Sequence, residues 1–86
     1  MNKFKKGDRV LILDPARSIQ DWGGDEPKTY AWKNRVVCTV DFYEVDGTEK
    51  RVYIKIPTHR SHVWSIHEDD LIRHRKPTIL IRSKYA

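Results

Sequence analysis

The chain has 86 residues, 38% of them hydrophobic and 34% charged, with a formal net charge of +5. This length forms one domain with one core and leaves no second lobe to enclose a substrate cleft. We therefore expect a non-enzymatic protein. Alternating apolar stretches exclude disorder along the whole chain. The apolar runs are too short for a membrane span.

The charge is distributed unevenly. Residues 1–9 and 73–86 are basic, whereas residues 14–26 are acidic. Basic ends favour nucleic acid or an acidic protein surface as the partner. The basic N-terminus lacks a following apolar stretch and predicts no signal peptide. The single cysteine, Cys38, permits no internal disulfide, so we expect a cytoplasmic protein.

Residues 9–13 (RVLIL) predict the first strand, and a long loop follows at residues 14–34. Within it, residues 16–22 predict one helical turn after a proline. The loop carries three large aromatic residues, Trp22, Tyr30 and Trp32, which either pin it to the sheet or form a protein-binding surface. We expect Trp32 to pack and Trp22 to remain exposed.

Residues 35–45 and 51–56 alternate between apolar and polar positions, which predicts half-buried antiparallel strands. Residues 62–66 and 78–82 are shorter candidates. These strands predict a core made of apolar side chains from one face of the sheet: Val10, Ile12, Val36, Cys38, Val40, Phe42, Val52, Ile54, Ile56, Trp64, Ile66 and Leu71.

The link between the two long strands contains Asp46-Gly47, a pair typical of two-residue hairpins. That turn would place Phe42 opposite Arg51, a core position against a solvent position. A three-residue turn or a bulge removes the conflict, with Gly47 at positive φ. The predicted pairs are then Phe42 with Val52, Val40 with Ile54 and Cys38 with Ile56, and on the outer face Tyr43 with Arg51 and Asp41 with Tyr53.

Two segments resemble a known fold. Residues 4–13 (FKKGDRVLIL) are similar to the opening strand of SH3-like barrels of the KOW and Tudor-like type. Residues 63–72 (VWSIHEDDLI) are similar to their ending, an aromatic strand, a short acidic 3₁₀ turn and a leucine. With the central hairpin, the resemblance covers residues 4–73. It implies an all-β fold, a small five-stranded SH3-like antiparallel barrel with a long loop after the first strand and an extra C-terminal strand.

The chain departs from this pattern at Lys33-Asn34, where KOW-like members usually carry a glycine-containing turn, and in the length of the preceding loop. No ligand of those barrels is therefore carried over. The domain organisation we expect is a barrel at residues 1–74 and a basic tail at residues 75–86. The tail contains a short strand that packs on the barrel or on a partner, which would allow a homodimer.

The histidines do not predict a metal site. His62 and His67 fall on opposite faces of a straight strand, and zinc needs three or four converging ligands. The acids at residues 68–70 are better explained as a 3₁₀ turn. Neighbouring carboxylates alone do not make acid–base catalysis. We expect no catalytic residues, no metal and no cofactor.

Two functions remain open. In the first, a basic and aromatic sheet face binds nucleic acid through phosphate contacts and base stacking; its candidate residues are Arg35, Tyr43, Arg51, Tyr53, Lys55, Arg75 and Lys76. In the second, the protein is an accessory or inhibitor protein of bacteria or phages that docks on a partner through Trp22, Tyr30 and Trp32. A Tudor-like aromatic cage for a methylated cation is a third idea.

Overall fold

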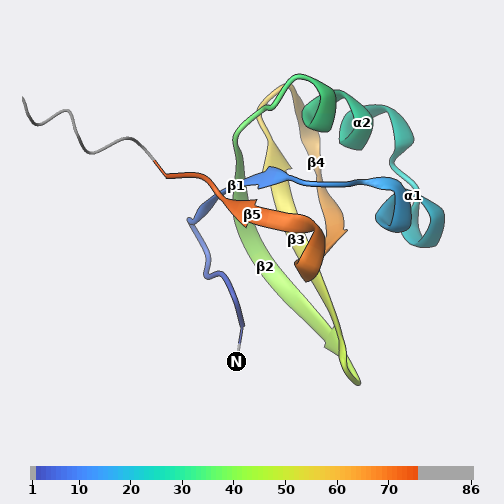
Figure 1. Ribbon diagram of the computed structural model, residues 1–86, viewed down its shortest axis with the longest axis vertical. Coiled ribbons are helices and arrows are strands. Elements are labelled where there is room, and N and C mark those ends of the chain that lie inside the picture. Colours follow the sequence, from blue (N-terminus) through green and yellow to red (C-terminus); the bar gives the residue numbers. More distant parts are fainter. Residues whose placement is uncertain (1, 76–86) are drawn as a thin grey trace, which may run out of the picture.

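The computed structural model describes residues 2–75, which form one five-stranded antiparallel sheet and two short helices (Figure 1). The strand order is β4-β3-β2-β1-β5. The elements in chain order are β1 (Arg9–Ile12), α1 (Ala16–Trp22), α2 (Asp25–Lys33), β2 (Cys38–Asp46), β3 (Glu49–Ile56), β4 (His59–His67), the 3₁₀ turn η1 (Glu68–Asp70) and β5 (Leu71–Arg73).

The predicted all-β class is confirmed at the level of this sheet. The edge strands β4 and β5 do not pair with each other within residues 2–75, so the sheet is not closed. The predicted 3₁₀ turn is present as η1, and Leu71 after it is buried.

The predicted strand at residues 78–82 and the candidate Lys76 lie outside the described residues. Among the described residues, neither helix is long and apolar enough to cross a membrane.

The hairpin of β2 and β3 contains a bulge. Val40 pairs with Ile54 as predicted, but Phe42 pairs with Tyr53, so Asp41 is an extra residue in β2. The turn itself has two residues: Asp46 pairs with Glu49, and Gly47 has a φ of 64°. The predicted bulge and the positive φ are therefore confirmed, and the three-residue turn is wrong.

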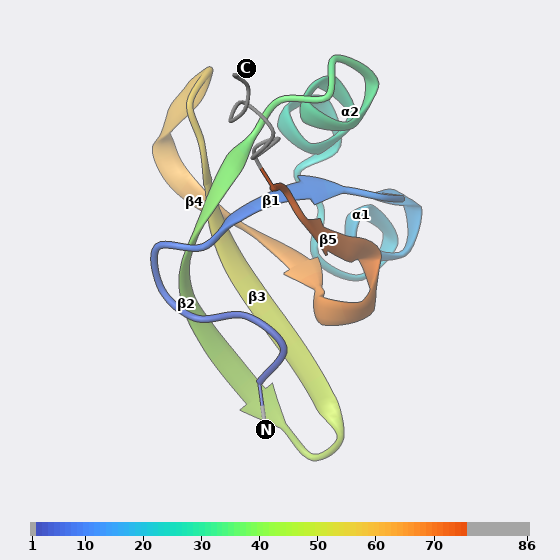
Figure 2. The same cartoon turned by 60° about the vertical axis from the view of Figure 1, so that its left-hand side comes forward.

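The bulge reverses the faces of β2 beyond Val40. Side chains alternate with period two, so one inserted residue moves all later ones to the opposite face. Phe42, predicted in the core, is 47% exposed, whereas Tyr43, predicted on the outer face, packs against the core. The N-terminal segment crosses β2 there (Figure 2), and the backbone N–H of Phe4 donates to Tyr43 Oη at 2.7 Å. Burial raises the pKa of Tyr43 to about 12.

The core otherwise follows the alternation of the strands. The predicted positions that are buried are Val10, Ile12, Cys38, Val40, Val52, Ile54, Ile56, Ile66 and Leu71. Val36 and Trp64 are partly buried and pack against this cluster. Phe4 and Ala31 are two further core residues that the pattern did not predict. Burial raises the pKa of the Cys38 thiol to about 12, which keeps it protonated and inert.

The predicted long loop contains two helices. α1 matches the predicted helical turn, but α2 was not predicted, because its segment contains Gly23-Gly24 and Pro27, which are typical of loops. Pro27 lies in the first turn of α2, where backbone N–H groups have no helical partner, so it does not break the helix. Gly24 adopts the left-handed conformation, and a Cβ there would lie 3.2 Å from Trp64. Glycine at position 24 thus separates the two helices.

Candidate functional site

The outer face of the β2–β3 hairpin presents a stacked aromatic pair. The rings of Phe42 and Tyr53 lie 4.4 Å apart between centroids at an interplanar angle of 14°. Tyr53 is held in place because its hydroxyl accepts from Arg51 Nη1 and donates to Glu44 Oε1. Phe42 is the more exposed ring and leaves part of its surface open to solvent. A fixed ring on an exposed sheet is a platform on which a planar group can stack.

Basic side chains lie on the same face, farther from the hairpin turn. Arg9 pairs with Thr39 and Thr39 pairs with Lys55, so these three side chains form a row across β1, β2 and β3. Lys55 and Tyr53 are two residues apart and share the face. Lys55 Nζ lies 3.8 Å from Asp41 Oδ1, a weak pairing at an exposed site. Arg9 has no ion pair within residues 2–75.

A cleft of ≈ 460 Å³ adjoins the row at the end of the β3–β4 hairpin. It arises because Ile54 pairs with Trp64 and Ile56 with His59, so β4 loops outward between the two pairs. The cleft is lined by Thr39, Lys55, Ile56, Pro57, Arg60, Ser61, His62 and Val63. Its exposed Arg60 adds a further cation that has no ion pair among the described residues.

The structure places the predicted nucleic-acid-binding residues of β2 and β3 on two different faces of the sheet. Arg51, Tyr53 and Lys55 share the outer face of β3, whereas Tyr43 points to the other side. The hydrogen bond that Arg51 donates to the Tyr53 hydroxyl raises the pKa of Arg51, and the Arg51 guanidinium carbon lies 4.2 Å from the Trp22 ring centroid. The remaining described candidates, Arg35 and Arg75, are exposed. Phe42 was missed because it was assigned to the core.

The loop aromatics are arranged opposite to expectation. Trp22 is half-buried and its ring stacks on His67 with centroids 4.2 Å apart. Trp32 is 41% exposed and Tyr30 38% exposed, both on α2. The expectation that Trp32 packs and Trp22 is free was therefore wrong. Trp22 ends α1 beside β4, which places it over the sheet.

A buried lysine lies between the helices and the sheet. Lys28 is 1% exposed, and its Nζ donates to the Ser18 carbonyl oxygen at 3.4 Å. Desolvation, together with repulsion from Arg51, lowers the pKa of Lys28 to about 8. Lys28 also lines a groove of ≈ 420 Å³ with Trp22 and Trp64. No pattern in the sequence indicated its burial.

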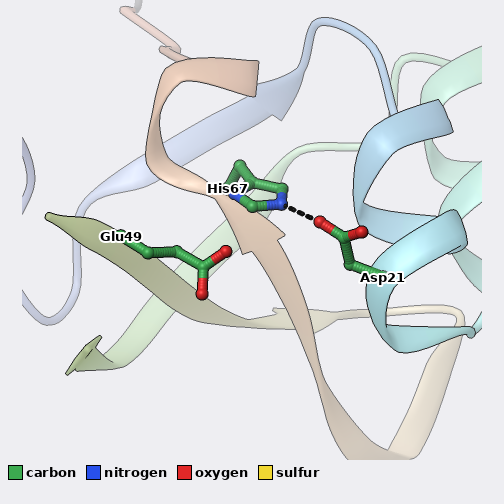
Figure 3. Close-up of side chains that lie close together, drawn as sticks. All are labelled: Asp21, Glu49 and His67. Atoms are coloured by element: carbon green, nitrogen blue, oxygen red, sulfur yellow. Dashed lines mark hydrogen bonds and ion pairs between the residues drawn. The ribbon is translucent and has the colours of Figure 1, made fainter. Parts of the chain in front are cut away.

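His67 is the most enclosed histidine of the described chain, with 7% of its surface exposed. Its backbone N–H donates to Ser18 Oγ at 2.9 Å, and Trp22 covers the ring. The ring Nε2 lies 2.8 Å from Asp21 Oδ2, as the dashed line in Figure 3 marks. Among the described residues, one group of three potential metal ligands lies close together, and it consists of His67, Asp21 and Glu49.

No protein-family model, curated protein or solved structure matches this chain.

Proposed function

We propose that the protein binds single-stranded nucleic acid, without catalysing a reaction, through the outer face of β2 and β3. The observation that carries the proposal is the exposed Phe42 ring, stacked on Tyr53 and followed by the Arg9–Lys55 row. Stacking of a base on an aromatic side chain contributes about 1–3 kcal/mol and works with any base. The row supplies cations for the phosphates that follow each stacked base.

A single strand fits this face better than a duplex. The bases of a single strand have open ring faces that can stack on Phe42, whereas the bases of a duplex stack on each other and their faces are covered. The cleft beside Arg60 extends the basic path beyond Lys55. Asp41 and Glu44 each pair with a cation of the same face, so the free positive charge comes from Arg9 and Arg60.

Removing the exposed ring tests the proposal. Phe42→Ala should weaken binding of a fluorescent single-stranded oligonucleotide by about 1–3 kcal/mol, measured by anisotropy at low salt. It should lower the free energy of unfolding by no more than about 1.5 kcal/mol, because only the ring pair is lost. Trp32→Ala is the matched control: it removes an exposed aromatic ring from α2 and should leave affinity unchanged. Equal affinities for the two variants, or no binding at low salt, would refute the proposal.

The second candidate function is protein docking through α2. It is favoured by the exposure of Tyr30 and Trp32, since both residue types are frequent anchors of protein interfaces. Trp22, the third predicted anchor, is already occupied by His67 and Arg51. A partner captured from lysate that survives nuclease treatment and is lost with Trp32→Ala would favour docking. A partner that Trp32→Ala still captures, and that nuclease treatment removes, would favour the nucleic-acid function.

The finer assignments belong to this proposal as well. We propose that the fold is an open variant of the SH3-like barrel of the KOW or Tudor-like type, and that the protein works in the cytoplasm beside proteins of nucleic-acid metabolism. Support comes from the terminal motifs and from β1, which pairs with both β2 and β5 and so joins the first and last described strands. A homodimer through the strand predicted at residues 78–82 remains a proposal.

A further inference from the structure

Three side chains with metal-binding atoms converge where α1 approaches the hairpin. Asp21 comes from α1, Glu49 begins β3 and His67 ends β4 (Figure 3). One ligand atom from each lies within 4.8 Å of the other two. The expectation of no metal site was argued from His62 and His67, which lie on one strand. It did not consider carboxylates 46 residues and 18 residues earlier in the chain, which only the tertiary fold brings to His67.

We propose that Asp21, Glu49 and His67 bind one Zn²⁺ ion, with water completing the coordination. One imidazole nitrogen and two carboxylate oxygens form a donor set that zinc accepts, and three protein ligands plus water is a common open zinc site. The imidazole favours transition metals over Mg²⁺ and Ca²⁺, which prefer oxygen donors alone.

The site is largely preformed. His67 is held by the Ser18 hydroxyl on its backbone and by the Trp22 ring on its side chain. Asp21 Oδ2 is already 2.8 Å from the imidazole nitrogen. Tetrahedral zinc separates neighbouring ligand atoms by about 3.3–3.5 Å, so the metal replaces this hydrogen bond with a small opening of the pair. Ser18 and Trp22 therefore act as the outer support that orients a metal-binding histidine.

Glu49 is the ligand whose side chain adjusts its position when the metal binds. Its carboxylate is exposed and interacts electrostatically with Arg51. Glu49 and His67 both line an open cleft of ≈ 330 Å³, which gives an ion access from solvent. The cleft is also lined by Glu68 and Asp69 and by the cations Arg17 and Lys50. Arg51 is also paired with Glu44 at 3.4 Å and lies over the Trp22 ring, so Glu49 is not its main partner.

The test is calorimetric titration of the untagged full-length protein with Zn²⁺ after removal of metal with a chelator. We expect one ion per chain and a higher thermal midpoint with zinc. Glu49→Gln, an exposed substitution, should weaken zinc binding at least about tenfold, the lower end of what even supporting residues contribute. Asp21→Asn should do the same. Excess Mg²⁺ should not compete.

Two control variants separate this site from other zinc-binding positions. Glu26→Gln removes an exposed carboxylate of α2, and His62→Ala removes an exposed imidazole of β4; both should bind zinc as the wild type does. The proposal is overturned if zinc binding is absent, if it survives in Glu49→Gln and Asp21→Asn, or if His62→Ala abolishes it. The site is separate from the nucleic-acid proposal, because Phe42→Ala leaves all three ligands in place.

Discussion

Lys28 places an ammonium group in the interior of the protein, against Gly24 and beside the Trp22 ring. One hydrogen bond of 3.4 Å to the Ser18 carbonyl is weak compensation for a buried cation. Desolvation therefore lowers the pKa of Lys28 from 10.5 to about 8. Between these two pH values the unfolded chain binds more protons than the folded one, so the contribution of Lys28 to stability rises with pH.

Lys28→Met should stabilise the protein at pH 7 by about 1–3 kcal/mol, because it removes a poorly paired buried charge and keeps the volume. This gain should shrink as pH rises from 8 to 10.5, since the wild-type lysine then loses its charge. Urea unfolding of both proteins at each pH gives the difference, in which the alkaline titrations of Cys38 and Tyr43 cancel. Lys33→Met, exposed on the same helix, should show no such trend. A difference independent of pH would contradict the assignment.

At the scale of elements, helix α1 protects the edge strand β4. β4 pairs with β3 on one side, and α1 packs against it, while α2 packs against β1. Ser18 of α1 is fully buried and its hydroxyl accepts the backbone N–H of His67. An unpaired edge strand invites pairing with another chain, so a helix along the edge limits aggregation. The same contact fixes the position of Trp22 and Asp21 over the sheet.

Ser18→Ala should lower the free energy of unfolding by about 1–3 kcal/mol, because the His67 N–H is left buried without an acceptor. The better helix propensity of alanine offsets a few tenths of this cost. Hydrogen exchange of the His67 amide should become faster, which reports on the contact directly. Gln20→Ala, at an exposed position of α1, should change neither quantity. Unchanged exchange at His67 in Ser18→Ala would show that α1 docks by other means.

Across the described molecule, three ion pairs lie near η1 and β5, and two more, Arg51–Glu44 and Lys55–Asp41, lie on the outer face of the sheet. Lys3–Asp69, Arg17–Asp70 and Arg73–Asp8 join segments far apart in the chain near η1 and β5. The cations that remain without an ion pair in residues 2–75 include Arg9 and Arg60, which lie along the proposed nucleic-acid path. Exposed pairs contribute little stability, so this distribution bears on binding more than on folding.

Four phosphate contacts on a single strand should give a slope of roughly −2.8 for the logarithm of the binding constant against the logarithm of salt concentration. Arg9→Ala and Arg60→Ala should each flatten this slope by about 0.7. Lys33→Ala removes an exposed cation from α2 and serves as the control that leaves the slope unchanged. Binding that is tight but insensitive to salt would be inconsistent with a phosphate-directed interface.

Local patterning was enough to predict most of the sheet. Period-two alternation located the strands, most of the core and the Val40–Ile54 pair, because side-chain direction in a strand depends only on the backbone next to it. Gly47 at positive φ was predicted for the same local reason. The sequence did not predict that Phe42 faces solvent and Tyr43 faces the core. Both residues are aromatic, so the alternation of apolar and polar positions looks similar with or without a bulge before them.

The site residues depended on contacts that no short stretch of sequence contains. Asp21 and His67 are 46 residues apart, and Phe4 and Tyr43 are 39 residues apart. Lys28 reads as an ordinary surface residue of a polar segment, and its burial follows only from the way two helices fold onto β4 and β1. The sequence by itself determined where the strands lie and which face of most of them is apolar, because these are consequences of local backbone geometry. The tertiary structure alone decided which rings face solvent and which carboxylates meet a histidine, because those arrangements depend on strand register and helix docking across the whole chain.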